Sequence, residues 1–341
     1  TCRRCIGRRS LPIALGITLM SCSQNQQPAN TAAPEHKFHA EETTFAVNGH
    51  KAILLSQPQS ADQTKPQIIS AEVLPGRGMN ILRVKAYIPG KGVIDLLATP
   101  PDSDVAAALN NGPDDQYGNG SFKFGGAILV PFANRIRGKL LPDGKTLETT
   151  VLGKKLDLIA NWKGKKPGAE PHAMHGLILD RAVDNLSLTP GDDAASATGT
   201  INAGNFNGHW PSKSNVVITT KLEADSFDLT VAVKNVGDED LPVGVGWHPY
   251  FAFPSGQREQ VKLKIPAKKM AVVNNYDDVF PTGKLIPMKG AYAFNADGGK
   301  ALEKNFLDDC FVDLNKDASG SVTAEIIDPA AKYGLKIIGL S

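Results

Sequence analysis

Four short segments of the sequence combine side chains that can move a proton or hold a polar ligand. They are residues 131–136 (PFANRI), 172–176 (HAMHG), 244–251 (GVGWHPYF) and 307–311 (LDDCF). Imidazole transfers protons near neutral pH, guanidinium donates several hydrogen bonds in a fixed fork, and carboxylates accept them. These residue types indicate acid/base chemistry on a polar ligand, provided that the fold brings the four segments together.

The first and last segments supply a cation and two carboxylates. Asn134 and Arg135 follow an apolar run, so they would end a strand, where an arginine can bind a ligand or simply pair with a surface carboxylate. Asp308 and Asp309 are neighbours, and neighbouring side chains of a strand point to opposite faces. We therefore expect at most one of them in a given site and the other in solvent; a turn formed by the pair is the alternative.

The segment 172–176 supplies two histidines. His172 and His175 lie three residues apart, but no cysteine or HExxH helix accompanies them, so the pattern does not favour a metal site. We expect a single positioned histidine instead, with Gly176 allowing a ligand to approach closely. No metal or other cofactor is expected.

The segment 244–251 combines Trp247, His248 and Tyr250. An aromatic face packs against the C–H groups of a sugar, and an imidazole beside it can pass a proton. This composition favours a carbohydrate site in which Trp247 contacts the substrate. The alternative is a core aromatic cluster with a satisfied histidine.

The four segments would be positioned by β-strands, because apolar and polar residues alternate with a period of two over most of residues 38–341. Asn48-Gly49 is a strong hairpin signal, and residues 216–233 alternate on both sides of a turn at 224–226. The apolar run 122–132 also resembles a strand. We therefore predict an all-β fold, one large sandwich over residues 38–341.

Two smaller predictions concern a helix and a cysteine. Residues 103–109 are expected to form the one short helix, with Ser103 as its N-cap and Gly112 just beyond its end. Cys310 is expected to be a buried apolar residue.

Composition restricts the class of partner. The 341 residues carry 37 Lys+Arg and 35 Asp+Glu, which leaves no basic field for nucleic-acid binding. Four arginines and no acid lie before Cys22, and the apolar run 11–20 is too short to span a bilayer. Residues 1–22 are therefore predicted to be a signal peptide.

The end of that signal peptide predicts where the protein resides. Leu19-Met20-Ser21-Cys22 resembles a bacterial lipobox, so Cys22 is the expected lipidation site; an ordinary cleaved signal is the alternative. Residues 23–37 are polar and nearly uncharged and read as a flexible tether. The protein is then expected in the cell envelope, facing the periplasm or in the outer membrane, with the membrane contacted only through this anchor.

The ordered set of motifs resembles a known family. PFANRI, HAMHG, GWHPYF, FPTG and LDDCF occur in the same order in aldose 1-epimerases (galactose mutarotases), and the resemblance covers roughly residues 40–341. It implies the galactose mutarotase-like β-supersandwich, with a sugar cleft on one sheet face and a small-molecule sugar as the substrate.

The resemblance also implies roles for individual residues. Arg135 matches the arginine that hydrogen-bonds sugar hydroxyls, and Asn134 before it helps to set the loop. His175 matches the histidine that contacts the sugar and stabilises developing charge. His248 matches the general acid that protonates the ring oxygen. Asp308 matches the aspartate that holds a sugar hydroxyl.

One role finds no match. In the family the general base is a glutamate near the C-terminus, well beyond the position of Asp308. Here Glu325 is the only glutamate after Asp308, and its setting, VTAEII, resembles an ordinary strand. We therefore expect the chain to be truncated at its C-terminal end, with the base outside it.

The predicted function is interconversion of the anomers of free aldohexoses such as glucose or galactose. A non-catalytic carbohydrate-binding lipoprotein, using Arg135, His175 and Asp308, is the first alternative, because the base is missing. A hexose-6-phosphate 1-epimerase is the second. It would need several cations around a phosphate, whereas the clustered lysines at 163–166 resemble a solvated loop.

Overall fold

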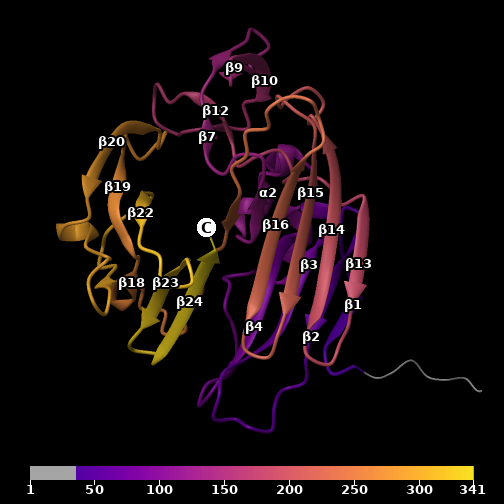
Figure 1. Cartoon of the computed structure of the whole chain (residues 1–341), viewed down its shortest axis with the longest axis vertical. Coiled ribbons are helices and arrows are strands. Elements are labelled where there is room, and N and C mark those ends of the chain that lie inside the picture. Colours follow the sequence, from indigo (N-terminus) through magenta and orange to yellow (C-terminus); the bar gives the residue numbers. More distant parts are fainter. Residues whose placement is uncertain (1–35, 341) are drawn as a thin grey trace, which may run out of the picture. The chain divides into compact units, whose positions relative to one another are not determined.

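The computed structural model describes residues 36–340, and strands make up most of its regular structure (Figure 1). The prediction of an all-β fold is confirmed. Two antiparallel sheets form the sandwich: β1-β2-β3-β4-β5, which has more strands than any other sheet of the described region, and β13-β14-β15-β16, one of two sheets there with four strands. Their strands are β1 (His39–Val47), β2 (His50–Ser56), β3 (Gln67–Leu74), β4 (Asn80–Ile88), β5 (Gly92–Asp95), β13 (Asn185–Thr189), β14 (Ala195–Gly204), β15 (Ser214–Leu222) and β16 (Phe227–Asn235).

Alternation of side chains explains why these two sheets pack together. In β15 every second residue from Ser214 to Leu222 is buried. Val216 and Ile218 of that strand share one hydrophobic cluster with Ile53 and Leu55 of β2. Burying one face of each sheet supplies the main apolar stabilisation of such a sandwich.

Both predicted hairpins are confirmed. Asn48 and Gly49 adopt φ values of 52° and 79° and connect β1 to β2 through the pair Val47↔His50. Positive φ at both turn positions is what a two-residue hairpin of this hand requires. Residues 224–226 lie in the turn between β15 and β16, whose last pair is Leu222↔Phe227.

Three local predictions are wrong in detail. The helix α1 (Asp102–Ala108) forms, but Pro101 stands at its N-cap and the hydroxyl of Ser103 donates to the neighbouring Asp104 carboxylate. The run 122–132 is not one strand, because its start belongs to the helical turn α2 (Gly120–Lys123) and only β6 (Ala127–Leu129) is extended. Cys310 is exposed rather than buried.

Smaller sheets carry the segments that the sequence analysis singled out. Their orders are β11-β12-β7, β17-β6, β10-β9-β8, β21-β18-β23-β24 and β20-β19-β22. Their strands, besides β6, are β7 (Arg135–Ile136), β8 (Lys139–Leu140), β9 (Thr146–Val151), β10 (Lys154–Ile159), β11 (Trp162–Lys163), β12 (Pro171–Met174), β17 (Gly246–His248), β18 (Lys262–Lys264), β19 (Ala267–Val273), β20 (Pro281–Pro287), β21 (Lys300–Ala301), β22 (Cys310–Leu314), β23 (Ser321–Asp328) and β24 (Tyr333–Leu340).

Four short 3-10 helices complete the described elements. They are η1 (Pro75–Arg77), η2 (Pro113–Gly118), η3 (Arg258–Gln260) and η4 (Gly290–Tyr292). No helix within residues 36–340 has both the length and the apolar character needed to cross a bilayer. The predicted signal peptide, its Cys22 and most of the predicted tether lie outside the described residues.

Candidate active site

The structure joins the first and last of the four segments at Arg135. This residue begins β7, which pairs with β12 through Met174↔Arg135. Its side chain is only 12% exposed, and its Nη2 lies 3.9 Å from Oδ2 of Asp308. Its Nη1 donates to Oδ1 of Asn134 at 3.0 Å, so the asparagine fixes one side of the guanidinium while the other faces the aspartate.

Burial makes this arginine sensitive to nearby carboxylates. Burial lowers the pKa of Arg135, and the negative charges of Asp308 and Asp278 oppose that shift. A guanidinium nevertheless keeps its charge at any physiological pH. Arg135 is therefore a buried cation beside a carboxylate that is still 43% exposed.

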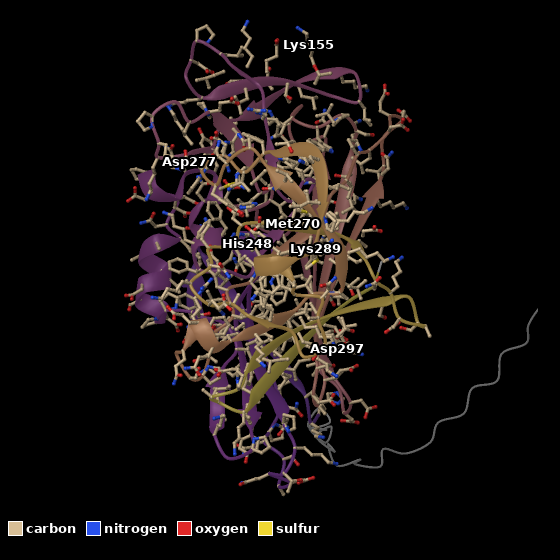
Figure 2. The ribbon with its side chains drawn as sticks, turned by 90° about the vertical axis from the view of Figure 1, so that its left-hand side faces the viewer. Lys155, His248, Met270, Asp277, Lys289 and Asp297 are labelled. Carbon is tan, nitrogen blue, oxygen red and sulfur yellow. The ribbon has the colours of Figure 1, made fainter. Side chains whose placement is uncertain are left out.

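The structure joins the two middle segments through their histidines. The rings of His175 and His248 lie with centroids 4.9 Å apart and planes inclined by 66°. Phe122 of α2 packs its ring against both, at centroid distances of 5.2 Å from His175 and 6.3 Å from His248. His248 is labelled in Figure 2. Two proton-carrying groups from segments far apart in sequence thus share one apolar wall.

The backbone holds His175 in a specific orientation. Its φ is 66°, and the next residue, Gly176, has φ 85°. A Cβ on Gly176 would lie 2.4 Å from the carbonyl oxygen of Val130, so only glycine lets the chain pass there. The His175 backbone N–H donates to the Asn134 carbonyl at 2.9 Å, and its Nδ1 lies 3.1 Å from the carbonyl oxygen of Ala133. A carbonyl only accepts, so Nδ1 carries the hydrogen and Nε2 is left as an acceptor.

His175 is uncharged at neutral pH. Burial, and after it the positive charge that His248 can carry, lower the pKa of His175 to about 4. The neutral ring can accept a hydrogen bond from a ligand hydroxyl through Nε2. It can also stand close to a protonated His248 without repelling it.

This low pKa predicts how stability depends on pH. His175 takes up a proton near pH 6.5 in the unfolded chain but only near pH 4 in the folded one. Its contribution is therefore complete above about pH 6.5 and is lost as the pH falls toward 4, an effect of about 2–4 kcal/mol. His175→Asn, which tolerates positive φ, should remove this dependence. Urea unfolding of both proteins from pH 7.5 to 4.5 should show the difference between them shrinking; a constant difference would contradict the assignment.

His248 ends β17, which pairs with β6 through His248↔Ala127. A Cβ on Gly246 would lie 2.9 Å from the Ala133 side chain, so glycine allows β17 to pass this close to the 131–136 segment. Burial lowers the pKa of His248, and the charge of Asp308 acts in the opposite direction.

Asp308 is the carboxylate that the site groups share. Its charge acts on Arg135, on His248 and on Tyr250, and the pKa of Tyr250 is raised first by burial and then by Asp308. The Tyr250 ring lies 5.3 Å from that of His248. Donors, an acceptor and a protonatable imidazole therefore gather around one exposed carboxylate, which suits a ligand with several hydroxyl groups.

A comparison with known proteins assigns most of this sequence to a family. The family model for aldose 1-epimerase matches residues 94–339, more than two thirds of the chain. The chain belongs to the aldose 1-epimerase family. A stretch of 41 residues is also 46% identical to the Escherichia coli protein YphB, but it spans only 12% of this chain and 14% of that protein.

Solved structures with mutarotase folds resemble this aldose 1-epimerase family member. A galactose mutarotase-like protein of Clostridium acetobutylicum is 18% identical, with a TM-score of 0.60 over 89% of this chain and 83% of that one. The galactose 1-epimerase of Lactobacillus acidophilus is 16% identical, with a TM-score of 0.54 over 86% and 78%. At such identities the likeness concerns the fold, and it confirms the predicted galactose mutarotase-like β-sandwich.

The fold separates Trp247 of this family member from the histidine pair. This residue alternates with His248 on β17, so the two side chains leave the strand on opposite faces. Trp247 packs against the main core and lies edge-on to Phe251 at 6.0 Å. The structure therefore does not bring Trp247 together with the histidine pair.

Asp309 meets an environment that differs from the prediction, and His172 lies apart in the interior. Asp309 is half-buried rather than solvated, and its Oδ1 accepts a hydrogen bond from the Tyr276 hydroxyl at 2.9 Å. His172 is fully buried, its Nδ1 donates to the Glu170 carbonyl at 3.0 Å, and its ring stands edge-on to Phe280. Among residues 36–340 no three or more His, Cys, Asp and Glu side chains are grouped as metal ligands.

Sequence reasoning missed three residues that the fold brings to this family member's site. Phe122 backs the histidines, Tyr276 binds Asp309, and the buried Asp278 acts on Arg135. Tyr276 and Asp278 lie in the loop 274–280 (NNYDDVF), beside Asp277, which Figure 2 labels. The loop resembles an ordinary polar connection, so only its contacts identify it.

Proposed function

We propose that the protein is an aldose 1-epimerase that interconverts the α and β anomers of free aldohexoses of the glucose and galactose type. The observation that carries this proposal is the gathering of Arg135, His175, His248 and Asp308 in a member of the aldose 1-epimerase family. Ring opening of a hemiacetal needs one group to remove a proton and one to supply a proton, with hydroxyl-binding groups around them.

The reaction uses proton transfers alone. A base removes the proton from O1 while an acid gives a proton to the ring oxygen O5, so the C1–O5 bond breaks and an open-chain aldehyde forms. Rotation about C1–C2 presents the other face of the aldehyde. The O5 hydroxyl then attacks C1, its proton returns to the acid, and O1 regains a proton. Each positioned acid or base contributes about 10²–10⁴-fold in rate.

In this mechanism His248 is the general acid. Arg135 donates to sugar hydroxyls, and Asn134, which accepts from the guanidinium at 3.0 Å, holds it in place. His175 is neutral with Nδ1–H directed to Ala133, so it accepts a sugar hydroxyl through Nε2. It is an acceptor for the substrate rather than a second cation.

The sequence analysis expected Asp308 to hold a sugar hydroxyl and the base to lie outside the chain; we assign the removal of the O1 proton to Asp308 instead. Its charge acts on Arg135 and on His248 alike, which supports a carboxylate in the group that would surround the sugar. Glu325, the glutamate considered from the sequence, instead lies on β23 with its Oε1 3.4 Å from Nζ of Lys264.

The lysines at 163, 165 and 166 are exposed, and they support no phosphate-binding role.

Polarimetry of freshly dissolved α-glucose and α-galactose tests the proposal. We expect the full chain to accelerate mutarotation, and Asp308→Asn to lower kcat/KM by about 10²-fold or more, as loss of a general base does. Asp309→Asn is the matched control, because an amide oxygen still accepts from Tyr276. It should keep most of the activity.

The same assay separates the proposal from its first alternative. A folded chain that binds either sugar in a calorimeter, but never changes the rate of rotation, would be a carbohydrate-binding protein. If Asp308→Asn and Asp309→Asn lower kcat/KM equally, the assignment of Asp308 as the general base is wrong, while the proposed epimerase activity stands.

We also propose that the protein is a lipid-anchored envelope protein. The support is sequence alone, the run Leu19-Met20-Ser21-Cys22. Cell fractionation tests it: the full chain should be recovered with membranes and Cys22→Ser in the soluble fraction, whereas identical recovery would exclude anchoring through Cys22.

A further inference from the structure

Exposed aromatic side chains gather near the candidate site. Tyr250, Tyr276 and Phe306 are each more than a third exposed. Tyr250 stands against His248, and Tyr276 binds the neighbour of Asp308. Aromatic surface is costly to leave in water, so its concentration beside a site for hydroxyl-rich ligands calls for a ligand-based explanation.

Tyr276 and Phe306 form a corner of two perpendicular rings. Their centroids lie 5.6 Å apart at an interplanar angle of 85°, with 42% of Tyr276 and 66% of Phe306 exposed. We call this pair the aromatic platform. Because Phe306 is mostly exposed, its ring can take a flat apolar surface.

The aromatic platform is held in place although it is exposed. The Tyr276 hydroxyl makes hydrogen bonds of 2.9 Å with both the Tyr292 hydroxyl and Oδ1 of Asp309. Arg258 donates to the carbonyl oxygens of Glu303 and Asn305, at 3.2 and 2.9 Å, just before Phe306. Groups fixed before binding lose little conformational entropy when a ligand arrives.

The segment that carries Phe306 also carries a carboxylate of the candidate site and contributes to the lining of a polar hollow. Phe306 lies two residues before Asp308, the carboxylate beside Arg135. An open hollow of about 650 Å³, lined by residues 256–260 and 303–304, includes Arg258, Glu303 and Lys304. The segment 303–308 therefore runs from charged hydrogen-bonding groups, past an exposed aromatic ring, to the proposed base.

We propose that the aromatic platform binds a second sugar unit and so gives the protein a preference for the reducing ends of oligosaccharides over free hexoses. This inference rests on the proposed function. The reducing-end unit would occupy the site around Asp308 with its O1 free, and the unit attached through another hydroxyl would lay its C–H face on Phe306. An aromatic ring receives such a face without reading individual hydroxyls, so the platform favours chain length over sugar identity.

Mutarotation kinetics of glucose, maltose and cellobiose test the platform. For the wild-type chain we expect a lower KM for at least one disaccharide than for glucose. Phe306→Ala should lower kcat/KM for that disaccharide about 3- to 10-fold, through KM, and leave glucose constants within about twofold. Tyr276→Phe, which keeps the ring but loses both hydroxyl bonds, should give a smaller loss. Val93→Ala, an exposed apolar change on β5, is the control.

Three results would overturn the platform. One is an equal loss on glucose and on the disaccharides, which means a general structural defect. Another is no loss on any sugar. The third is a concentration-dependent dimer of the wild type that Phe306→Ala abolishes in light scattering, because then a second copy of the chain covers the rings.

Failure of the proposed function gives a different result from failure of the platform. If the folded wild type accelerates no mutarotation, saturation-transfer NMR with maltose and cellobiose tests the platform directly. Binding that Phe306→Ala weakens about 3- to 10-fold, with glucose binding unchanged, keeps the platform and rejects the epimerase. Absence of disaccharide binding rejects the platform.

Discussion

Replacing His248 with alanine should lower kcat/KM for mutarotation of glucose and galactose by about 10²–10⁴-fold, the range that a positioned general acid supplies. The imidazole shares the apolar wall of Phe122 with His175 and lies under the influence of the Asp308 charge. Alanine retains the strand β17 and its pairing with β6, so sugar binding should weaken much less than turnover.

The control for this variant is a histidine outside the site. His39 is exposed on β1, and His39→Ala should leave the rate of mutarotation unchanged. Activity is read by polarimetry and folding by thermal unfolding of each variant. A folded His248→Ala protein with wild-type kcat/KM would remove His248 from the mechanism.

The pH profile gives a second measure of the same role. An acid must be protonated to act, and burial holds the pKa of His248 below its usual value near 6.5. The pH dependence of kcat/KM reports the ionisations of the free enzyme. We therefore expect kcat/KM of the wild type to fall with rising pH from below pH 6.5 upward, as His248 loses its proton. A rate that increases steadily from pH 6 to 8 would show that His248 does not act as the acid.

The fold could be predicted from the sequence where local signals were unambiguous. Asn48-Gly49 specifies its hairpin because few other residue pairs accept a positive φ at both positions. The alternation in residues 216–233 specifies two strands with one buried face. Ser103 failed as an N-cap because the helix begins at Asp102, with Pro101 at the N-cap two positions before Ser103.

The candidate site was predictable only in part, for a related reason. Arg135, His175, His248 and Asp308 stand in recognisable motifs, and the structure brings them together. Tyr276 and Asp278 reach the same region from a loop whose composition resembles any polar turn, and only tertiary contacts identify them. Trp247 leaves β17 on the face opposite His248, and a motif alone does not say which face of a strand looks inward.

A buried ion pair holds the wall behind the histidines. Arg77 of η1 and Asp115 of η2 are both 0% exposed and make two hydrogen bonds, Nη2–Oδ1 at 2.7 Å and Nη1–Oδ2 at 3.0 Å. The Arg77 Nε also donates to Ser121 Oγ at 2.9 Å, and the Asp115 carboxylate accepts the Gly120 N–H at 2.8 Å. The pair thus anchors α2, which presents Phe122 to His175 and His248.

Arg77→Met should therefore lower the free energy of unfolding by about 3–5 kcal/mol, because it leaves the Asp115 carboxylate buried without its cation. Urea unfolding at pH 7 measures this loss. Lys51→Met is the matched control: its partner is Glu42, both side chains are more than half exposed, and such a pair contributes about 0–1 kcal/mol.

Arg77→Lys resolves the case in which the methionine variant does not fold. Lysine keeps the charge but cannot reach both carboxylate oxygens and Ser121 at once, so it should fold with an intermediate loss. If Arg77→Lys and Arg77→Met both unfold at the same urea concentration as Lys51→Met, the ion pair does not hold this region. Both variants could instead be destabilised while the folded lysine variant keeps the wild-type rate of mutarotation. In that case the ion pair stabilises the fold without setting the position of Phe122, and the rate of mutarotation does not depend on how Phe122 packs against the two histidines.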